Sequence, residues 1–132
     1  MTRRALIIEY SDSYRKIMGE LLKNIGVTSH VAHSLEEATN ELSKSPDIEL
    51  IFCEHRTPNI NSIDFLKDFS TSQYSHIPKV VVSIDSAEEL KKEAKEHGAA
   101  GWLTKPFEEQ KFCLLVFHLC KFSQEEKDEF AS

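Results

Sequence analysis

The stretch LIFCEHRTPNI (residues 50–60) runs from four consecutive apolar residues into a glutamate, a histidine and an arginine, and then reaches a proline. Four apolar residues in a row predict a β-strand that is covered on both faces, because a strand with one solvated face alternates apolar and polar residues. Such strands are typical of parallel sheets between two layers of helices. The stretch therefore predicts an α/β fold, with Glu54 at the carboxyl end of a buried strand.

Further short apolar runs predict four more strands, with helix-period segments between them. The strand segments are ALII (5–8), VTSHVA (27–32), KVVVSI (79–84) and AGWLT (100–104). Amphipathic periodicity predicts helices over residues 12–25, 34–43 and 62–69, a fourth helix capped by Ser86, and a last continuous helix over residues 108–126. Strands that alternate with helices in this way return through right-handed crossovers, so we expect a (βα)5 three-layer sandwich with strand order 2-1-3-4-5.

Size and composition indicate one domain with a protein or small-ligand partner. The chain has 132 residues, which we divide into a domain at 1–126 and a tail at 127–132. The net charge of −6 argues against nucleic acid or an anionic membrane as the partner. An odd number of cysteines, three, suits a reducing compartment, and no segment is apolar enough for a signal peptide or a membrane span. We therefore expect a cytoplasmic protein.

Polar side chains occupy the predicted carboxyl ends of four strands. They are Glu9, Glu54, Ser83 and Lys105. Because ligands of open α/β sheets bind at the carboxyl ends of the strands, these residues should converge on one crevice. Two carboxylates, a hydroxyl and an ammonium are the kind of groups that bind phosphate and metal.

This pattern resembles the receiver (response regulatory) domain of bacterial two-component response regulators, the CheY-like, flavodoxin-like fold, over essentially the whole chain. In that family the first strand ends in two acids that help to hold Mg²⁺, the third in a phospho-accepting aspartate four residues before a proline, and the fourth in a hydroxyl residue. The fifth strand carries a switch aromatic residue and leads into Lys-Pro-Phe. The resemblance assigns Glu9 and Tyr10 to the acidic pair, Glu54 to the acceptor position, Ser83 and Trp102 to the switch, Lys105 to the pocket, and a cis bond to Pro106.

Three residues depart from the family pattern at its acidic pocket. Tyr10 offers no carboxylate to a hard cation that prefers oxygen ligands. Glu54 is one methylene longer than aspartate, which displaces its carboxylate from in-line attack. Arg56 brings a cation that could pair with Glu9 or Glu54. His55, a single histidine at a strand end, is expected to be solvated and without a role.

These departures lead us to expect a pseudo-receiver that is not an enzyme and needs no cofactor. In this interpretation Glu54 pairs with Lys105 and holds one signalling state without phosphorylation, and no metal is expected. Two alternatives stay open. In the first, Glu9 and Glu54 still bind Mg²⁺ and the domain is a phospho-accepting response regulator. In the second, of another class, the two carboxylates serve a small phosphatase or hydrolase.

The partner is expected to be a protein: a histidine kinase, a phosphotransfer protein or an effector. The resemblance implies an output and dimer surface on the fourth helix, fifth strand and fifth helix, so a homodimer through that surface is a further expectation. Helical spacing adds apolar residues on the last helix to this output surface, whose members would be Trp102, Cys113, Phe117 and Cys120.

Overall fold

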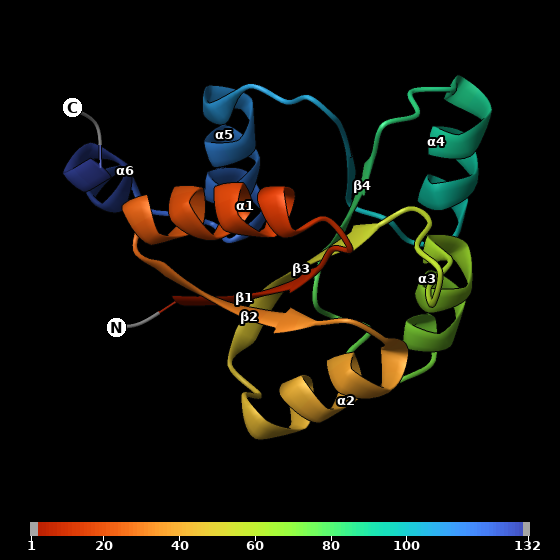
Figure 1. The fold of residues 1–132 in the computed structure, drawn as a ribbon. Coiled ribbons are helices and arrows are strands. Elements are labelled where there is room, and N and C mark those ends of the chain that lie inside the picture. The colour runs from red at the N-terminus through yellow and green to blue at the C-terminus, as the bar shows by residue number, and fades with distance from the viewer. Residues whose placement is uncertain (1–2, 131–132) are drawn as a thin grey trace.

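The computed structural model describes residues 3–130, which alternate strands and helices along the chain (Figure 1). In chain order the elements are β1 (Arg3–Ile8), α1 (Asp12–Asn24), β2 (Val27–Ala32), α2 (Leu35–Lys44), β3 (Ile48–Glu54), α3 (Ser62–Ser70), β4 (Lys79–Ser83), α4 (Glu88–Glu96), β5 (Gly101–Thr104), α5 (Glu109–Leu119) and α6 (Gln124–Phe130).

The five strands form one parallel sheet in the order β2-β1-β3-β4-β5. Helices α1 and α5 lie on one face of the sheet, and α2, α3 and α4 lie on the other (Figure 1). The predicted α/β class and strand order are therefore confirmed.

The apolar run of β3 is buried because each face of the sheet has its own core. Phe52 packs on the α1/α5 face, where its ring stacks on Phe112 with 5.1 Å between centroids. Cys53, the next residue, points to the opposite core beside Phe65. Both faces thus exclude water, which is why the strand shows no polar alternation.

The first helices begin at the predicted caps, but α4 does not. Ser11 accepts a hydrogen bond from the Tyr14 amide at the start of α1. At α4 the prediction of a Ser86 cap is wrong: Ala87 occupies the cap position. Asp85 Oδ1 accepts from the Ala87 amide at 2.9 Å, so the aspartate forms the turn that leads into this helix.

The prediction of one continuous helix over residues 108–126 is also wrong. Helix α5 ends at Leu119, and Lys121 adopts a left-handed conformation with φ of 53°. Ser123 and Glu126 then form a reciprocal capping box, with both hydrogen bonds at 3.0 Å, that starts α6. The expected boundary between domain and tail at residue 126 falls inside α6, and residues 131–132 of that tail lie outside the described residues.

Helix α6 lies near the amino ends of β1 and β2, at the opposite end of the sheet from the predicted crevice (Figure 1). Arg3 Nε and Nη2 each donate to the Glu126 carboxylate at 2.9 Å, and the Arg3 guanidinium lies 4.1 Å from the Phe122 ring centroid. Within residues 3–130, no helix combines the length and apolar character that a membrane crossing requires.

Candidate functional site

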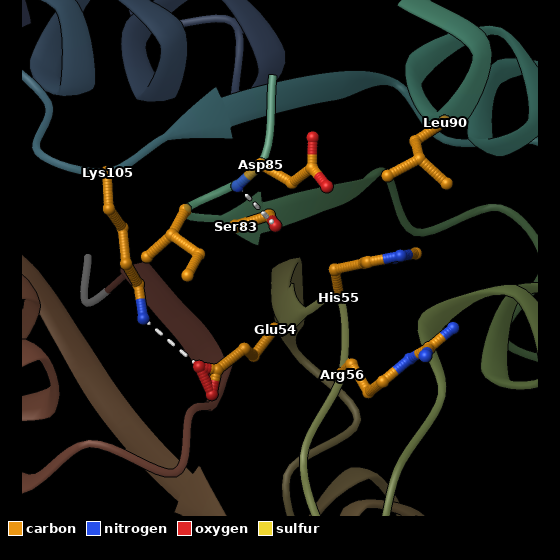
Figure 2. A pocket seen from close by; sticks show the side chains of 8 residues that line it. Glu54, His55, Arg56, Ser83, Asp85, Leu90 and Lys105 are labelled. Carbon is orange, nitrogen blue, oxygen red and sulfur yellow. Dashed lines mark hydrogen bonds and ion pairs between the residues drawn. The ribbon is translucent and has the colours of Figure 1, made fainter. Parts of the chain in front are cut away.

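The carboxyl ends of β1, β3, β4 and β5 bring the four predicted polar residues to one edge of the sheet. Pairing of Glu54 with Val82 and of Ser83 with Thr104 fixes the relative height of the last three strands. A cavity of about 410 Å³ opens there, with Glu54, Ser83 and Lys105 in its lining (Figure 2). Glu9 is not part of this lining and is 2% exposed.

Lys105 binds both glutamates at once. Its Nζ lies 3.1 Å from Glu54 Oε2, to which it donates a hydrogen bond, and 2.8 Å from Glu9 Oε1. The contact with Glu9 has ion-pair distance but not hydrogen-bond geometry, so Glu9 Oε1 is buried without a hydrogen-bond partner among residues 3–130. The Lys105 ammonium also lies 4.4 Å from the Tyr14 ring centroid, a cation–π contact. This arrangement, which we call the Lys105 ion triad, consists of Glu9, Glu54 and Lys105.

Burial and charge act in opposite directions within the ion triad. Burial raises the pKa of Glu9, and the neighbouring Glu54 carboxylate adds to the rise, while Lys105 and the Ser11 amide oppose it. Burial alone would lower the pKa of Lys105, but its close contacts with the Glu9 and Glu54 carboxylates outweigh burial and raise that pKa. Lys105 is therefore held as a charged ammonium between the two acids.

Tyr10 reaches the site through its backbone. Its amide donates to Glu54 Oε1 at 3.3 Å, whereas its side chain is 63% exposed to solvent. The Ser11 amide donates to Glu9 Oε2 at 3.1 Å, so the loop after β1 satisfies one oxygen of each glutamate. The phenol of Tyr10 adds neither charge nor an oxygen ligand to the crevice.

Arg56 does not pair with either glutamate in the described part of the chain, so the expected charge pairing is wrong. The side chain is exposed and points away from Glu54 and Lys105 (Figure 2). Its backbone forms an isolated antiparallel bridge with Asn61, which directs the loop toward α3 and the arginine toward solvent.

The switch residues contact one another through Asp85. Ser83 Oγ accepts from the Asp85 amide at 3.0 Å, and Trp102 Nε1 donates to the Asp85 carbonyl at 3.0 Å. Trp102 packs against the cluster of Ile63, Leu66, Val81 and Ala94 between α3 and α4. The Lys105–Pro106 peptide bond is cis.

Sequence reasoning missed His55, which is buried and not solvated. It is 8% exposed, and its Nδ1 lies 2.8 Å from Ser62 Oγ. Its ring centroid lies 5.4 Å from that of Trp102. Burial, followed by the charge of Arg56, lowers the pKa of His55, which favours the neutral imidazole. No sequence signal distinguished it from a solvated histidine, because its partners come from α3 and β5.

The predicted output surface on α5 needs correction. The α5 residue beside β5 is Leu115, whose Cδ1 would lie 3.5 Å from a β-carbon placed on Gly101. Cys113, Phe117 and Cys120 lie on the other side of the helix, away from Trp102. The Phe117 ring centroid is 4.8 Å from that of Phe122, and the Cys120 carbonyl accepts from Arg3. Cys120 is buried in the core on the α1/α5 face, and Cys113 and Phe117 are half-buried against it.

Within residues 3–130, no group of three or more histidine, cysteine, aspartate or glutamate side chains converges to hold a metal ion. The oxygen donors of the acidic pocket are the carboxylates of Glu9 and Glu54, and the Lys105 ammonium contacts both of them.

Comparison with known proteins agrees with the observed fold. Residues 5–117 match the family model for the response regulator receiver domain. The chain is 24% identical over 110 residues to the chemotaxis protein CheY-3 of Vibrio cholerae, with coverage of 79% of this chain and 81% of that protein. It is 31% identical over 103 residues to the KDP operon transcriptional regulatory protein KdpE of Escherichia coli, covering 77% of this chain and 44% of KdpE.

A solved structure shows the same fold. The crystal structure of a putative response regulator from Chloroflexus aurantiacus superposes with a TM-score of 0.84, at 22% identity, over 92% of this chain and 99% of that one.

Proposed function

The chain belongs to the response regulator receiver family, and we propose that within two-component signalling it is a pseudo-receiver whose signalling state is set by the Lys105 ion triad and not by phosphorylation. The observation that carries this proposal is the contact of Lys105 Nζ with Glu54 Oε2 at 3.1 Å. In the family, as the resemblance implies, this lysine pairs with the phosphoryl group. Here the Glu54 carboxylate takes the place of the phosphoryl group as the partner of Lys105.

The three charged side chains of the ion triad are buried. The side chain of Lys105 is 6% exposed, and those of Glu9 and Glu54 are 1% and 14% exposed. Charges in such positions must be paired, since an unpaired buried charge costs several kcal/mol, roughly 3–5 kcal/mol when one partner is removed. A phosphoryl group on Glu54 would have to compete with Glu9 for the same ammonium.

The donors do not fit the Mg²⁺ that the family implies. A hard divalent cation needs several oxygen ligands and is usually held by carboxylates. Tyr10, at the second acidic position, turns its neutral side chain to solvent. Glu9 and Glu54 already share a cation, and that ammonium repels a second one. The small number of oxygen ligands and the nearby ammonium thus support a pocket without a metal ion.

Action through protein binding fits better than the hydrolase alternative. In that alternative Glu9 and Glu54 act as paired carboxylates, but Glu9 is 2% exposed and both carboxylates contact Lys105, so neither is free for acid or base chemistry on a substrate. We propose that the domain is not an enzyme and that its partner is a protein of the signalling pathway, which recognises the surface around Trp102.

Mg²⁺ titration with Trp102 fluorescence tests the proposal, because Trp102 is the only tryptophan of the chain. We expect no saturable change in emission at millimolar Mg²⁺, and none on addition of beryllofluoride, a phosphoryl mimic. The double variant Tyr10→Asp/Glu54→Asp, which restores the family's acids, should gain a saturable response. A saturable response of the unmodified chain would overturn the proposal in favour of a phosphorylated receiver.

A further inference from the structure

We propose that His55 is a positioning residue that couples the Glu54–Lys105 ion pair to the orientation of Trp102. The inference rests on the proposed function in one respect, namely that the ion pair defines the signalling state. It does not depend on whether the domain can be phosphorylated.

Three hydrogen-bond contacts fix His55 in place. Its amide donates to the Val82 carbonyl at 2.8 Å, and its own carbonyl accepts from the Ser62 amide at 2.8 Å. The Nδ1–Ser62 Oγ contact, also 2.8 Å, fixes the imidazole. Because His55 is buried, rotation of its ring would leave Ser62 Oγ without a partner, at a cost of roughly 1–3 kcal/mol. The residue is therefore fixed to the ends of β3 and β4 and to the start of α3.

The imidazole contacts Trp102 directly. The ring centroids are 5.4 Å apart and the planes are tilted by 48°, an arrangement favourable for two aromatic rings. Glu54 is the chain neighbour of His55, so any displacement of the Glu54 backbone is passed to the ring that contacts Trp102. The end of β3 thus contacts the tryptophan of β5 through the His55 side chain, in addition to its pairing with β4.

A second series of contacts connects the ion pair, at Lys105, to Trp102. Lys105 donates its amide to the Ser83 carbonyl at 2.7 Å, and Ser83 Oγ, Asp85 and Trp102 Nε1 follow at 3.0 Å each. Of the residues in these contacts, Glu54, His55, Ser83, Asp85 and Lys105 line the 410 Å³ cavity, and Trp102 is not part of its lining (Figure 2). Among these contacts, the His55 side chain gives the acceptor-position strand a direct contact with Trp102.

A double-mutant cycle tests this coupling, because it isolates interaction between two positions from the effect of each change alone. We expect Glu54→Gln to shift the Trp102 emission maximum in the otherwise unchanged chain. In a His55→Asn background, where an amide retains the bond to Ser62 but the ring is gone, the same change should produce no shift. His55→Phe, which keeps a ring, should restore it.

Two controls separate coupling from general loosening. Ser62→Ala removes the hydrogen bond and not the ring, so the Glu54→Gln shift should persist even if the free energy of unfolding falls. Ser83→Ala breaks the second series of contacts and should leave the shift in place. The proposal is overturned if Glu54→Gln shifts the emission equally with and without the His55 ring, or if it produces no shift in the unmodified chain. Neither result depends on the Mg²⁺ titration, so its failure is distinguishable from failure of the proposed function.

Discussion

Lys105 Nζ and Glu54 Oε2 lie 3.1 Å apart although 51 residues separate them in the sequence. Their contact joins the end of β3 to the end of β5 across β4, at the edge where a receiver places its phosphoryl group. Glu9 approaches the same ammonium to 2.8 Å from β1. The pocket thus keeps the charge pattern of a receiver, but protein side chains supply both the positive and the negative charges.

Replacing Lys105 by methionine should strongly destabilise the domain. The change leaves Glu9 and Glu54 buried next to each other without a cation, and the loss of one partner of a buried ion pair costs about 3–5 kcal/mol. Urea unfolding measures the difference. Lys111→Met, at an exposed position of α5, is the matched control and should change the free energy of unfolding by about 0.5 kcal/mol or less. Equal effects of the two substitutions would contradict the buried ion triad.

Glu9→Gln should cost less stability than Lys105→Met, because Lys105 keeps Glu54 as its partner. Because burial raises the pKa of Glu9, the folded state favours the protonated acid. That contribution is fully present below the ordinary pKa of 4.5 and is lost as the pH rises through the raised pKa of the folded state. Glutamine imitates the protonated form at every pH, so the stability lost on substitution should be no larger at pH 7 than at pH 5. Urea unfolding at pH 5 and pH 7 checks this: a larger loss at pH 7 than at pH 5 would show that the sign is wrong.

Acid should release α6 before the rest of the domain. The hydrogen bonds from Arg3 lower the pKa of Glu126 to about 2 from an ordinary value of 4.5. A lowered pKa stabilises docking above pH 4.5, and the stabilisation is lost as the pH falls from 4.5 toward 2. Glu126→Gln should speed amide hydrogen exchange in α6 at neutral pH, while Glu125→Gln, one residue earlier, should not. Unchanged exchange in Glu126→Gln would mean that Arg3 does not hold this helix.

Gly26→Ala should destabilise the same end of the molecule for two separable reasons. Gly26 has φ of +77°, where a side chain costs about 1–3 kcal/mol. A β-carbon there would also lie 2.8 Å from Phe130 Cζ. In a Phe130→Ala background only the backbone cost remains, so the Gly26→Ala effect should shrink. Thermal unfolding of the four proteins measures the coupling, and strictly additive effects would exclude the predicted contact.

The sheet was predictable because its strands are buried on both sides. Apolar runs, such as those that contain Leu6 and Val81, mark strands with no solvent-exposed face. The spacing of these runs along the chain is compatible with a standard strand order. The residues that form the turns before α4 and α6 were harder to predict from the sequence. Asp85 starts the turn into α4 in place of Ser86, and Ser123 opens a new helix where periodicity alone continues the old one.

The site residues could be placed from sequence only as far as the strand register extends. Lys105 follows β5 and Glu54 ends β3, so topology brings them to one edge. The burial of His55 and the outward direction of Arg56 depend on α3 and its preceding loop, whose contacts are long-range and have no local pattern. The same holds for Cys120, an expected surface residue that is 8% exposed and belongs to the core on the α1/α5 face.

The most direct measurement of the central claim is intact-protein mass spectrometry after incubation with acetyl phosphate and Mg²⁺. We expect the unmodified chain to gain no phosphoryl group, because Glu54 remains paired with Lys105 and the pocket lacks the second acid. Tyr10→Asp/Glu54→Asp, treated in parallel, should gain one and so prove the assay. A phosphoryl group on Glu54 of the unmodified chain would contradict the account, since the domain would then be a working phospho-accepting receiver.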